Sequence, residues 1–353
     1  MKKIIALLLC LCTLAALGCT ALASESASTA GTNTNTDPIV VEDGVTVLAF
    51  TGDQHGETDN YHSWISDILG VYGDQLAMLS YSGDICNKNW EQDVYEGFVD
   101  VLEQEVPGRY NVTTGNQEFK SGAPGNDWDA LGEGFTRIGE VVATDDYIIY
   151  DLGSAQENMV LPQEDIDAVA AYLDAAPTDV PIFILSHYPL HLSVGTDSHS
   201  IPGQGNYRQL ENNAALIEVL NEHPNVIFLW GHNHTFADPR YGTIRGAGSS
   251  FTYDYENPTD KVELNFTYAN YGCFCRGDSY GVVAEVTRTD AGVQVSMHFI
   301  DEDVYMTNKD AAVITVAADG TVTTDITDGD GVDLDEILSM SGYPDDPDFI
   351  EEF

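Results

Sequence analysis

Two histidines, His232 and His234, lie two residues apart in the stretch WGHNHTF, directly after the apolar run VIFLW. In an extended backbone, residues at this spacing project to the same side, so both imidazoles can point at one site. Neutral imidazole is a common metal ligand. A lone histidine at a strand end is more often a hydrogen-bonded surface or core residue, so a metal site requires further donors elsewhere in the chain.

Four other apolar runs also end in oxygen or imidazole donors. VLAF leads to Asp53 and His55, LSY to Asp84, NVTT to Asn116, and IFILS to His187. Taken singly, the acids and the amide could be helix caps or turn residues, and His187 could be a core histidine. However, α/β sheets place their ligand sites at the carboxyl ends of strands. The whole set therefore predicts a metal site formed by Asp53, His55, Asp84, Asn116, His187, His232 and His234.

The segments between these donors alternate between short apolar runs and helical patterns, which is typical of an α/β fold. The apolar runs predict strands at 45–50, 76–81, 110–114, 147–152, 182–186 and 226–230, and the helical patterns predict helices at 60–69, 90–105, 162–176 and 213–223. After Gly231 the pattern changes to short alternating stretches around turns. We expect one β-hairpin over residues 280–300 and another over 312–324, with Asp319-Gly320 at its turn.

The first residues have the pattern of a secretory signal peptide: two lysines, an apolar run over residues 4–17, and then small residues. Two processing sites compete there. Residues 21–23 match the A-x-A pattern of ordinary signal cleavage, whereas residues 17–19 resemble a lipobox that would place a lipid anchor on Cys19. We favour simple secretion. Both alternatives predict an exported protein, either secreted or lipid-anchored at the cell surface, with no other contact to a membrane.

The chain is expected to divide into five segments, and its length of 353 residues with 43% apolar content is enough to bury a core. Residues 24–40 form a Ser/Thr/Asn-rich stretch without hydrophobic periodicity, which indicates a flexible tether. Residues 325–353 hold eleven acidic residues and neither lysine nor arginine, but the spacing of the acidic residues does not match a calcium loop. The segments are a signal peptide at 1–23, a tether at 24–40, an α/β domain at 41–304, a β-hairpin at 305–324 and an acidic tail at 325–353.

The charge balance is strongly acidic, with 13 basic and 58 acidic residues and a formal net charge of −45. Such a field repels nucleic-acid polymers and anionic membrane surfaces, although a small phosphate compound held by metal ions is compatible with it. Solubility or salt tolerance explains most of these carboxylates.

Outside the signal the chain has three cysteines, Cys86, Cys273 and Cys275. An odd number of cysteines gives no reason to expect a disulfide scaffold. Cys273 and Cys275 form a Cys-x-Cys pair, but the chain has no second cysteine pair with zinc-ligand spacing, so a zinc-cysteine site is not expected either. One disulfide from Cys86 to Cys273 or Cys275 stays open. The oligomeric state is also left open.

The ordered set D-x-H, G-D, G-N, H and G-H-x-H resembles the signature of the calcineurin-like metallophosphoesterases over residues 45–301. The resemblance implies a two-sheet β-sandwich flanked by helices, a four-layer α/β/β/α arrangement, for the domain at 41–304. It also implies two divalent or trivalent metal ions. One would be bound by Asp53, His55 and His234 and the other by Asn116, His187 and His232, with Asp84 bridging them.

The mixture of carboxylate, amide and imidazole ligands suits manganese, iron, zinc or nickel. Two such cations about 3.5–4 Å apart can hold a bridging hydroxide and clamp the phosphoryl oxygens during in-line displacement. We therefore expect an enzyme, a metal-dependent phosphoesterase that hydrolyses a small phosphoester without a covalent phospho-enzyme. The expected catalytic residues are Asp84, Asn116 and Gln117.

The sequence departs from the family's pattern at two positions. Gln117 stands where the family commonly has the histidine of G-N-H-E, and glutamine cannot deliver a proton to a leaving group. This favours a phosphodiester or a nucleotide-like substrate, or a substitute acid such as His191 or His199. Asn87 stands where the purple acid phosphatases have a tyrosine ligand, so a tyrosinate-iron centre is not expected.

Arg208 is a candidate contact for a substrate phosphate, since guanidinium can bind phosphate bidentately. The alternative is that it pairs with the surplus acids at the surface. An alternative function is also open: a non-catalytic exported metal-binding protein that uses the fold for display or partner binding. Gln117 is the residue that favours this alternative.

Overall fold

A computed structural model of the chain describes residues 44–87, 91–119, 139–153, 161–190, 213–232, 244–252, 261–274, 281–300 and 312–326. The chain divides into two compact units, Met1–Thr34 and Asn35–Phe353, and every described residue belongs to the second unit. The expected signal peptide at 1–23, with Cys19, and the tether at 24–40 lie outside the described residues. So does most of the expected acidic tail.

The larger of two main sheets has seven strands in the order β15-β14-β13-β12-β1-β2-β3. Strands β1, β2 and β3 are parallel to one another, and the remaining neighbours pair antiparallel. The bounds are β1 Thr46–Thr51, β2 Leu76–Tyr81, β3 Tyr110–Val112, β12 Gly281–Thr289, β13 Gly292–Ile300, β14 Ala312–Val316 and β15 Val322–Ile326.

The second sheet has six strands in the order β4-β5-β6-β7-β11-β8. Its four central strands, β5, β6, β7 and β11, are parallel, and the two edge strands run antiparallel to them. The bounds are β4 Val141–Ala143, β5 Ile148–Gly153, β6 Ile182–Ser186, β7 Val226–Trp230, β8 Ile244–Arg245 and β11 Thr267–Asn270, while β9 Ser250–Thr252 and β10 Lys261–Glu263 form a separate pair.

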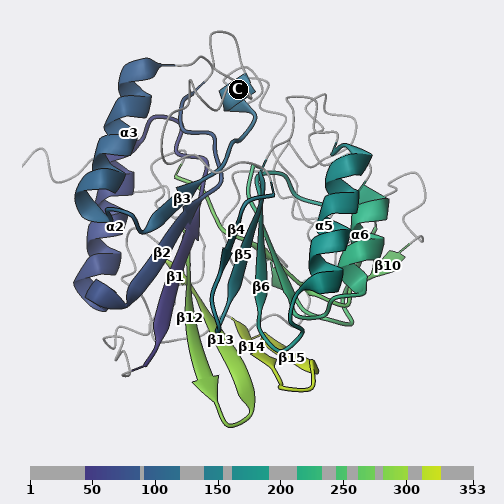
Figure 1. Ribbon diagram of the computed structural model, residues 1–353. Coiled ribbons are helices and arrows are strands. Elements are labelled where there is room, and N and C mark those ends of the chain that lie inside the picture. Colours follow the sequence, from purple (N-terminus) through teal and green to yellow (C-terminus); the bar gives the residue numbers. More distant parts are fainter. Residues whose placement is uncertain are drawn as a thin grey trace, which may run out of the picture. The chain divides into compact units, whose positions relative to one another are not determined.

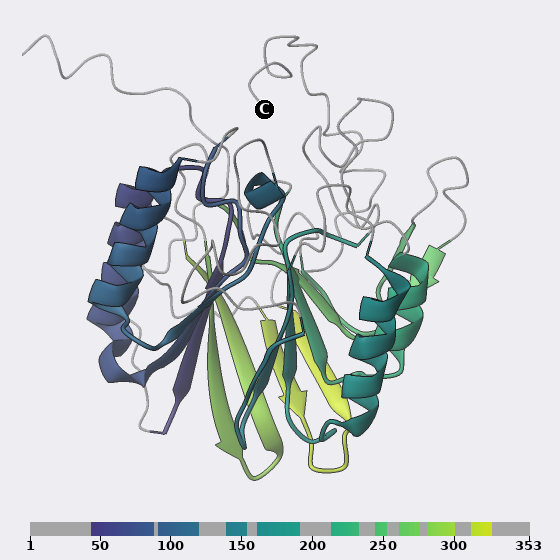
Figure 2. The same ribbon diagram turned by 45° about the horizontal axis from the view of Figure 1, so that its top comes forward.

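Four longer helices cover the outer faces of the two sheets: α2 Thr58–Tyr72, α3 Gln92–Glu105, α5 Gln163–Ala175 and α6 Asn213–Asn221. Figure 1 shows α2 and α3 beside the strands β1 to β3, and α5 and α6 beside β6, and the rotated view in Figure 2 agrees. Two short 3₁₀ turns, Gly73–Gln75 and Gln117–Phe119, complete the described helices. None of the helices in the described part of the chain is long and apolar enough to span a membrane.

The period-2 alternation of β1 explains the layering, because successive side chains of a strand point to opposite faces. Leu48 and Phe50 join a core shared with the second sheet, and the Phe50 ring stacks on Phe183 of β6 with centroids 5.1 Å apart. Val47 and Ala49 join the other core, beneath α2 and α3. The expected α/β class and four-layer sandwich are thereby confirmed.

The second hairpin is part of the main sheet. β14 and β15 pair on either side of Asp319-Gly320, and β14 also pairs with β13 through Val293 and Val316. β15 continues to Ile326, two residues beyond the 324 expected from sequence, because the alternation of half-buried and exposed residues persists that far.

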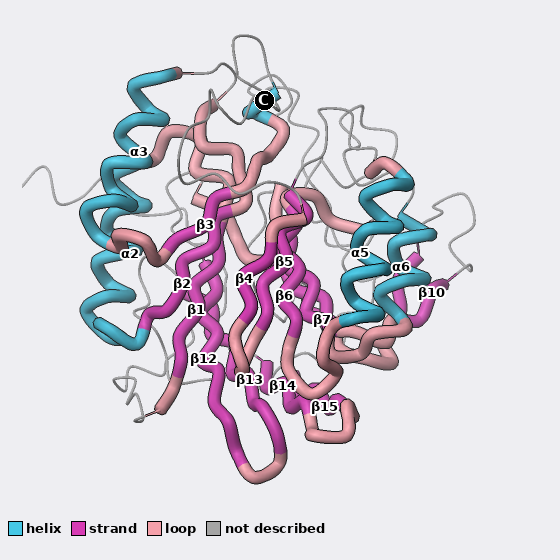
Figure 3. The backbone as a smooth tube through the Cα atoms, viewed as in Figure 1, coloured by secondary structure: helices cyan, strands magenta, loops and turns pink. Residues whose placement is uncertain are grey.

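Parallel strands of one sheet end at the same edge, and here the parallel strands of both sheets end at the same end of the sandwich. Figure 3 shows the loops that follow β3 and β6, coloured pink, at this common end. The expected donors follow β1, β2, β3, β6 and β7 in the sequence. The topology therefore brings donors from two sheets together.

Candidate metal centre

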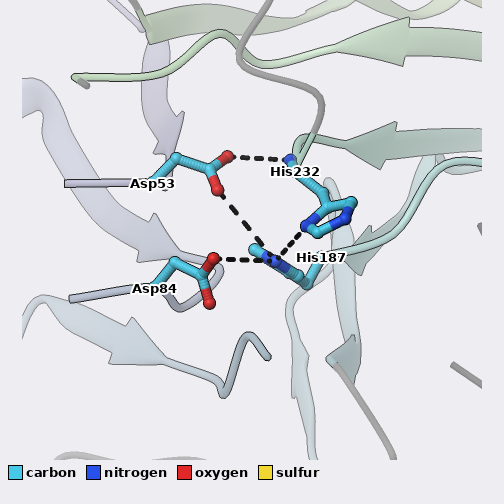
Figure 4. A group of neighbouring side chains, drawn as sticks. All are labelled: Asp53, Asp84, His187 and His232. Carbon is cyan, nitrogen blue, oxygen red and sulfur yellow. Dashed lines mark hydrogen bonds and ion pairs between the residues drawn. The ribbon is translucent and has the colours of Figure 1, made fainter. Parts of the chain in front are cut away.

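Four of the expected donors converge on one point, namely Asp53, Asp84, His187 and His232. One ligand atom of each residue lies within 4.8 Å of those of the other three. Figure 4 shows the two carboxylates facing the two imidazoles. All four side chains are buried, with at most 3% of their surface exposed. Their origins in β1, β2, β6 and β7 mean that neither sheet alone could form this group.

His187 is held in one orientation by a backbone carbonyl. Its Nδ1 lies 2.8 Å from the carbonyl oxygen of Ser82, which can only accept, so Nδ1 carries the proton that is donated. In the neutral ring this leaves Nε2 with its lone pair toward the site. Nε2 lies 3.1 Å from Asn116 Oδ1 and 3.1 Å from His232 Nδ1. Donors about 2.1 Å from a shared cation stand roughly 3 Å apart when they meet at a right angle, so this spacing suits a metal.

The Asp84 carboxylate lies between two histidines. Its Oδ1 accepts a hydrogen bond of 2.7 Å from the backbone N–H of Gln117, which leaves Oδ2 directed into the site. Oδ2 lies 3.4 Å from His187 Nε2 and 3.6 Å from His55 Nε2. One carboxylate oxygen thus faces a histidine on either side, which is the position that a bridging ligand would need.

Asp53 takes a similar intermediate place. Its Oδ2 accepts a 2.8 Å hydrogen bond from the backbone N–H of His232, which links the loop after β1 to the loop after β7. Its Oδ1 lies 3.9 Å from His55 Nε2 and 4.0 Å from His187 Nε2. Asp53 and Asp84 together separate His55 from His187.

Burial of several acids in one place shifts their proton affinities. Burial, reinforced by the charge of Asp84, raises the pKa of Asp53 to about 7, although His187 acts in the opposite direction. Burial opposes ionisation of Asp84 too, but the charge and hydrogen bond of His187 prevail and lower its pKa. For His187, burial would lower the pKa, yet Asp84 and Asp53 outweigh it and raise the pKa to about 9.

These residues fit a metal ion. The site concentrates carboxylates in a buried position, where unpaired negative charge is costly and a cation would compensate it. The donors are the oxygen and imidazole types that transition metals prefer, with one nitrogen of His187 fixed toward them by Ser82. Asp53, Asp84, Asn116, His187, His232 and His55 are the described residues that would hold the metal.

Four of the candidate ligands share an unusual backbone conformation. Among the described residues, the non-glycine positions with positive φ are Asp53 at 55°, His55 at 49°, Asp84 at 60° and His232 at 70°. This region is sparsely populated for residues with a Cβ and costs on the order of 1–3 kcal/mol each. Backbone hydrogen bonds of 3.0 Å from Asp53 N to Gly83 O and from His55 N to Asp84 O maintain it.

Glu118 is a residue whose role the motif did not reveal. It is fully buried, and its carboxylate accepts hydrogen bonds from the backbone N–H groups of Asp84 at 2.9 Å, Ile85 at 3.0 Å and Gly115 at 2.6 Å. It therefore ties the loop after β2 to the loop after β3. Burial and the nearby Asp84 raise the pKa of Glu118 to about 7. The sequence signal was its place in the stretch G-N-Q-E.

A tyrosine near the site and the remaining residues expected from sequence have different outcomes. The hydroxyl of Tyr81 accepts a 2.7 Å hydrogen bond from Gln54 N, so this tyrosine supports the loop between Asp53 and His55. Cys86 is a buried free thiol and forms no disulfide. The expected metal ligand His234, the candidate substrate contacts His191, His199 and Arg208, and Cys275 lie outside the described residues.

No protein-family model matches the chain, and no curated protein matches it. Solved structures do resemble it. A sulfate thiohydrolase of Thermus thermophilus is 10% identical with a TM-score of 0.45, over 87% of this chain and 62% of that one. The NAD nucleotidase of Haemophilus influenzae is 12% identical with a TM-score of 0.43, over 85% and 56%.

A third similar structure is GAP50, the anchor in the inner membrane complex of Plasmodium, at 12% identity and a TM-score of 0.43, over 86% of this chain and 96% of that one. This chain spans little more than half the length of the two enzymes. At these identities and TM-scores the similarities do not assign the chain to a family.

Proposed function

We propose that this chain is a metal-dependent hydrolase of phosphoester bonds. The observation that carries the proposal is the convergence of Asp53, Asp84, His187 and His232 from four strand ends, with donor atoms within 4.8 Å of one another. Asn116 joins them through the 3.1 Å approach of its Oδ1 to His187. Two cations of manganese, iron, zinc or nickel are the cofactors that we propose for this donor set.

The chain's own residues contribute orientation and charge. Bound cations would activate a water molecule and neutralise the oxygens of a phosphoryl group. In the neutral form of His187, which metal binding requires, the Ser82 carbonyl favours the tautomer that presents the Nε2 lone pair. The backbone N–H of Gln117 fixes the Asp84 carboxylate through Oδ1. These contacts hold His187 and Asp84 in place before a substrate arrives, which favours a preorganised site.

Gln117 bears on the class of substrate. Its side-chain Oε1 is buried and has no hydrogen-bond partner among the described residues. A glutamine amide can donate a hydrogen bond to a phosphoryl oxygen but cannot protonate a leaving group. We therefore favour a small phosphodiester or nucleotide-like substrate whose leaving group needs little help, rather than a simple alkyl monoester.

The remaining parts of the proposal rest on sequence. The signal pattern at 1–23 supports export, with secretion or a lipid anchor at Cys19 as the two outcomes. The net charge of −45 supports a small substrate instead of a nucleic-acid polymer. His191, His199 and Arg208 are retained as candidate substrate contacts.

The same glutamine favours a second candidate function, an exported metal-binding protein without catalytic activity. Loss of the proton donor would leave the metal centre intact while removing turnover of most esters. In that case the fold would serve display or binding of a partner. The two candidates agree on metal binding and differ only in turnover.

The experiment is to express the chain without residues 1–23, load it with manganese, iron or zinc, and measure hydrolysis of two esters. Bis-p-nitrophenyl phosphate reports diesterase activity and p-nitrophenyl phosphate reports monoesterase activity. Asp84→Ala should reduce turnover at least 100-fold, since even residues that only support ligands account for about 10–100-fold. A faster reaction of the diester would support the proposed class of substrate.

The matched control is Asp174→Ala. Asp174 belongs to a second acidic and histidine group with Glu222 and His223, but its side chain is 72% exposed. This variant should keep full activity. If the protein binds two metals yet turns over neither ester nor a panel of nucleotides, the non-catalytic candidate is the correct one.

A further inference from the structure

Tyr271 follows β11 and lies beneath the metal centre. Its backbone N–H donates a 2.9 Å hydrogen bond to Trp230 O, which extends the parallel pairing of β11 with β7 by one residue. The side chain is fully buried in the core between the sheets. This register directs the phenol ring toward the loops that carry the metal ligands.

The ring fills the space left by two glycines. A Cβ on Gly52 would lie 2.8 Å from Tyr271 Cε2 and 2.9 Å from its hydroxyl oxygen. A Cβ on Gly231 would approach the same ring even more closely. These glycines directly precede the ligands Asp53 and His232, so one side chain touches both ligand loops at the residue before the ligand.

The hydroxyl of Tyr271 reaches a third loop. Ser82 donates a hydrogen bond from its hydroxyl to the phenol oxygen. The carbonyl oxygen of Ser82 in turn accepts the 2.8 Å hydrogen bond from His187 Nδ1. Ser82 lies two residues before Asp84, so the phenol is connected to the loop of one ligand and to the imidazole of another.

We propose that Tyr271 is a positioning residue that sets the separation of the loops carrying Asp53, Asp84 and His232 without binding metal itself. The inference rests on the proposed function in one respect, namely that these residues bind metal. Three loops from two sheets meet at this one ring. A smaller residue would let the loops move together and change the distances between the donors.

The test compares Tyr271→Leu with Tyr271→Phe by calorimetry of Mn²⁺ binding to the metal-free chain, without any substrate. Residues that support metal ligands typically account for about 10–100-fold in affinity. Tyr271→Leu should therefore weaken Mn²⁺ binding by about 10–100-fold. Tyr271→Phe keeps the ring between Gly52 and Gly231 and loses only the contact to Ser82, so it should restore most of the affinity.

Tyr147→Leu is the matched control. Tyr147 belongs to the same core and is 5% exposed, but it lies next to the amino end of β5, at the opposite end of the strands from the ligands. It should lose stability without losing Mn²⁺ affinity. If Tyr271→Leu does not fold, Gly231→Ala provides the second variant, because its Cβ would displace the same ring.

Each result bears on one claim. Unchanged affinity in Tyr271→Leu, or an equal loss in Tyr147→Leu, overturns the positioning role. Complete loss of one metal ion in Tyr271→Phe also overturns it, because the hydroxyl would then be a ligand. If the unmodified chain binds no Mn²⁺ at all, it is the proposed function that fails.

Discussion

Gly83→Ala tests whether the close approach of two loops positions the bridging candidate Asp84. Gly83 has φ of +86°, and a Cβ placed on it would overlap the backbone of Gly115 in the loop after β3. Positive φ costs a residue with a Cβ about 1–2 kcal/mol. Forcing extra atoms into a packed site adds about 1–3 kcal/mol. We expect a loss of about 2–5 kcal/mol in the free energy of unfolding.

Gly248→Ala separates these two contributions. Gly248 has the same φ of +86°, but a Cβ there would meet nothing within 4 Å. The free energy of unfolding of Gly248→Ala should therefore fall only by the cost of positive φ, about 1–2 kcal/mol. Urea denaturation of both metal-free variants measures the difference, and calorimetry should show weaker metal binding for Gly83→Ala alone. Equal destabilisation of the two variants would refute the claim that packing against Gly115 holds the Asp84 loop.

Three further predictions concern other parts of the molecule. Gln117→His should raise turnover of an alkyl phosphate by about 100-fold or more relative to turnover of p-nitrophenyl phosphate, because a general acid contributes that much when the leaving group is poor. Steady-state kinetics on both esters would measure the ratio. Removal of bound metal by a chelator should lower the melting temperature, since metal at 100 times its dissociation constant stabilises the folded state by about 2.7 kcal/mol. Calorimetric scans with and without chelator would measure the change in melting temperature. Glu285→Gln should destabilise the protein at neutral pH. Burial opposes ionisation of Glu285, but its contacts with His298 and Tyr72 prevail and lower its pKa. The stabilisation that ionised Glu285 provides is therefore complete above the ordinary pKa of 4.5 and is lost as pH falls through the lowered pKa. The difference from the unmodified protein in denaturant titrations should therefore shrink with acid.

The strands that carry the ligands could be predicted because they are buried on both faces. β6 and β7 are buried at every residue, and such strands appear in a sequence as continuous apolar runs. The helices were predicted with their ends off by a few residues, as for α2, expected at 60–69 and observed at Thr58–Tyr72. Helix ends depend on local capping and fray easily, so periodicity locates them poorly.

β11 could not be predicted from the same signals. Its four residues, Thr267–Asn270, contain no apolar run, and its place is fixed by parallel pairing with β7, some 40 residues earlier in the chain. Tyr271 follows from that pairing, so its approach to the ligand loops was equally hidden. Glu118 was visible only as the last residue of a motif, because the three N–H groups that it accepts belong to two different loops.

The backbone at the ligands gives an independent reason to regard the site as functional. Strained conformations persist only where the surrounding structure enforces them, and they cluster at functional sites. Here Asp53, His55, Asp84 and His232 are the non-glycine residues with positive φ in the described part of the chain, and each is a donor expected from sequence. Aspartate and histidine adopt positive φ more readily than most residues, and aspartate does so in ordinary turns, so it is the gathering of four such positions at neighbouring strand ends that points to a function. All four of these residues with positive φ belong to the sequence motif, and this coincidence supports the proposed metal centre over four unrelated turn residues.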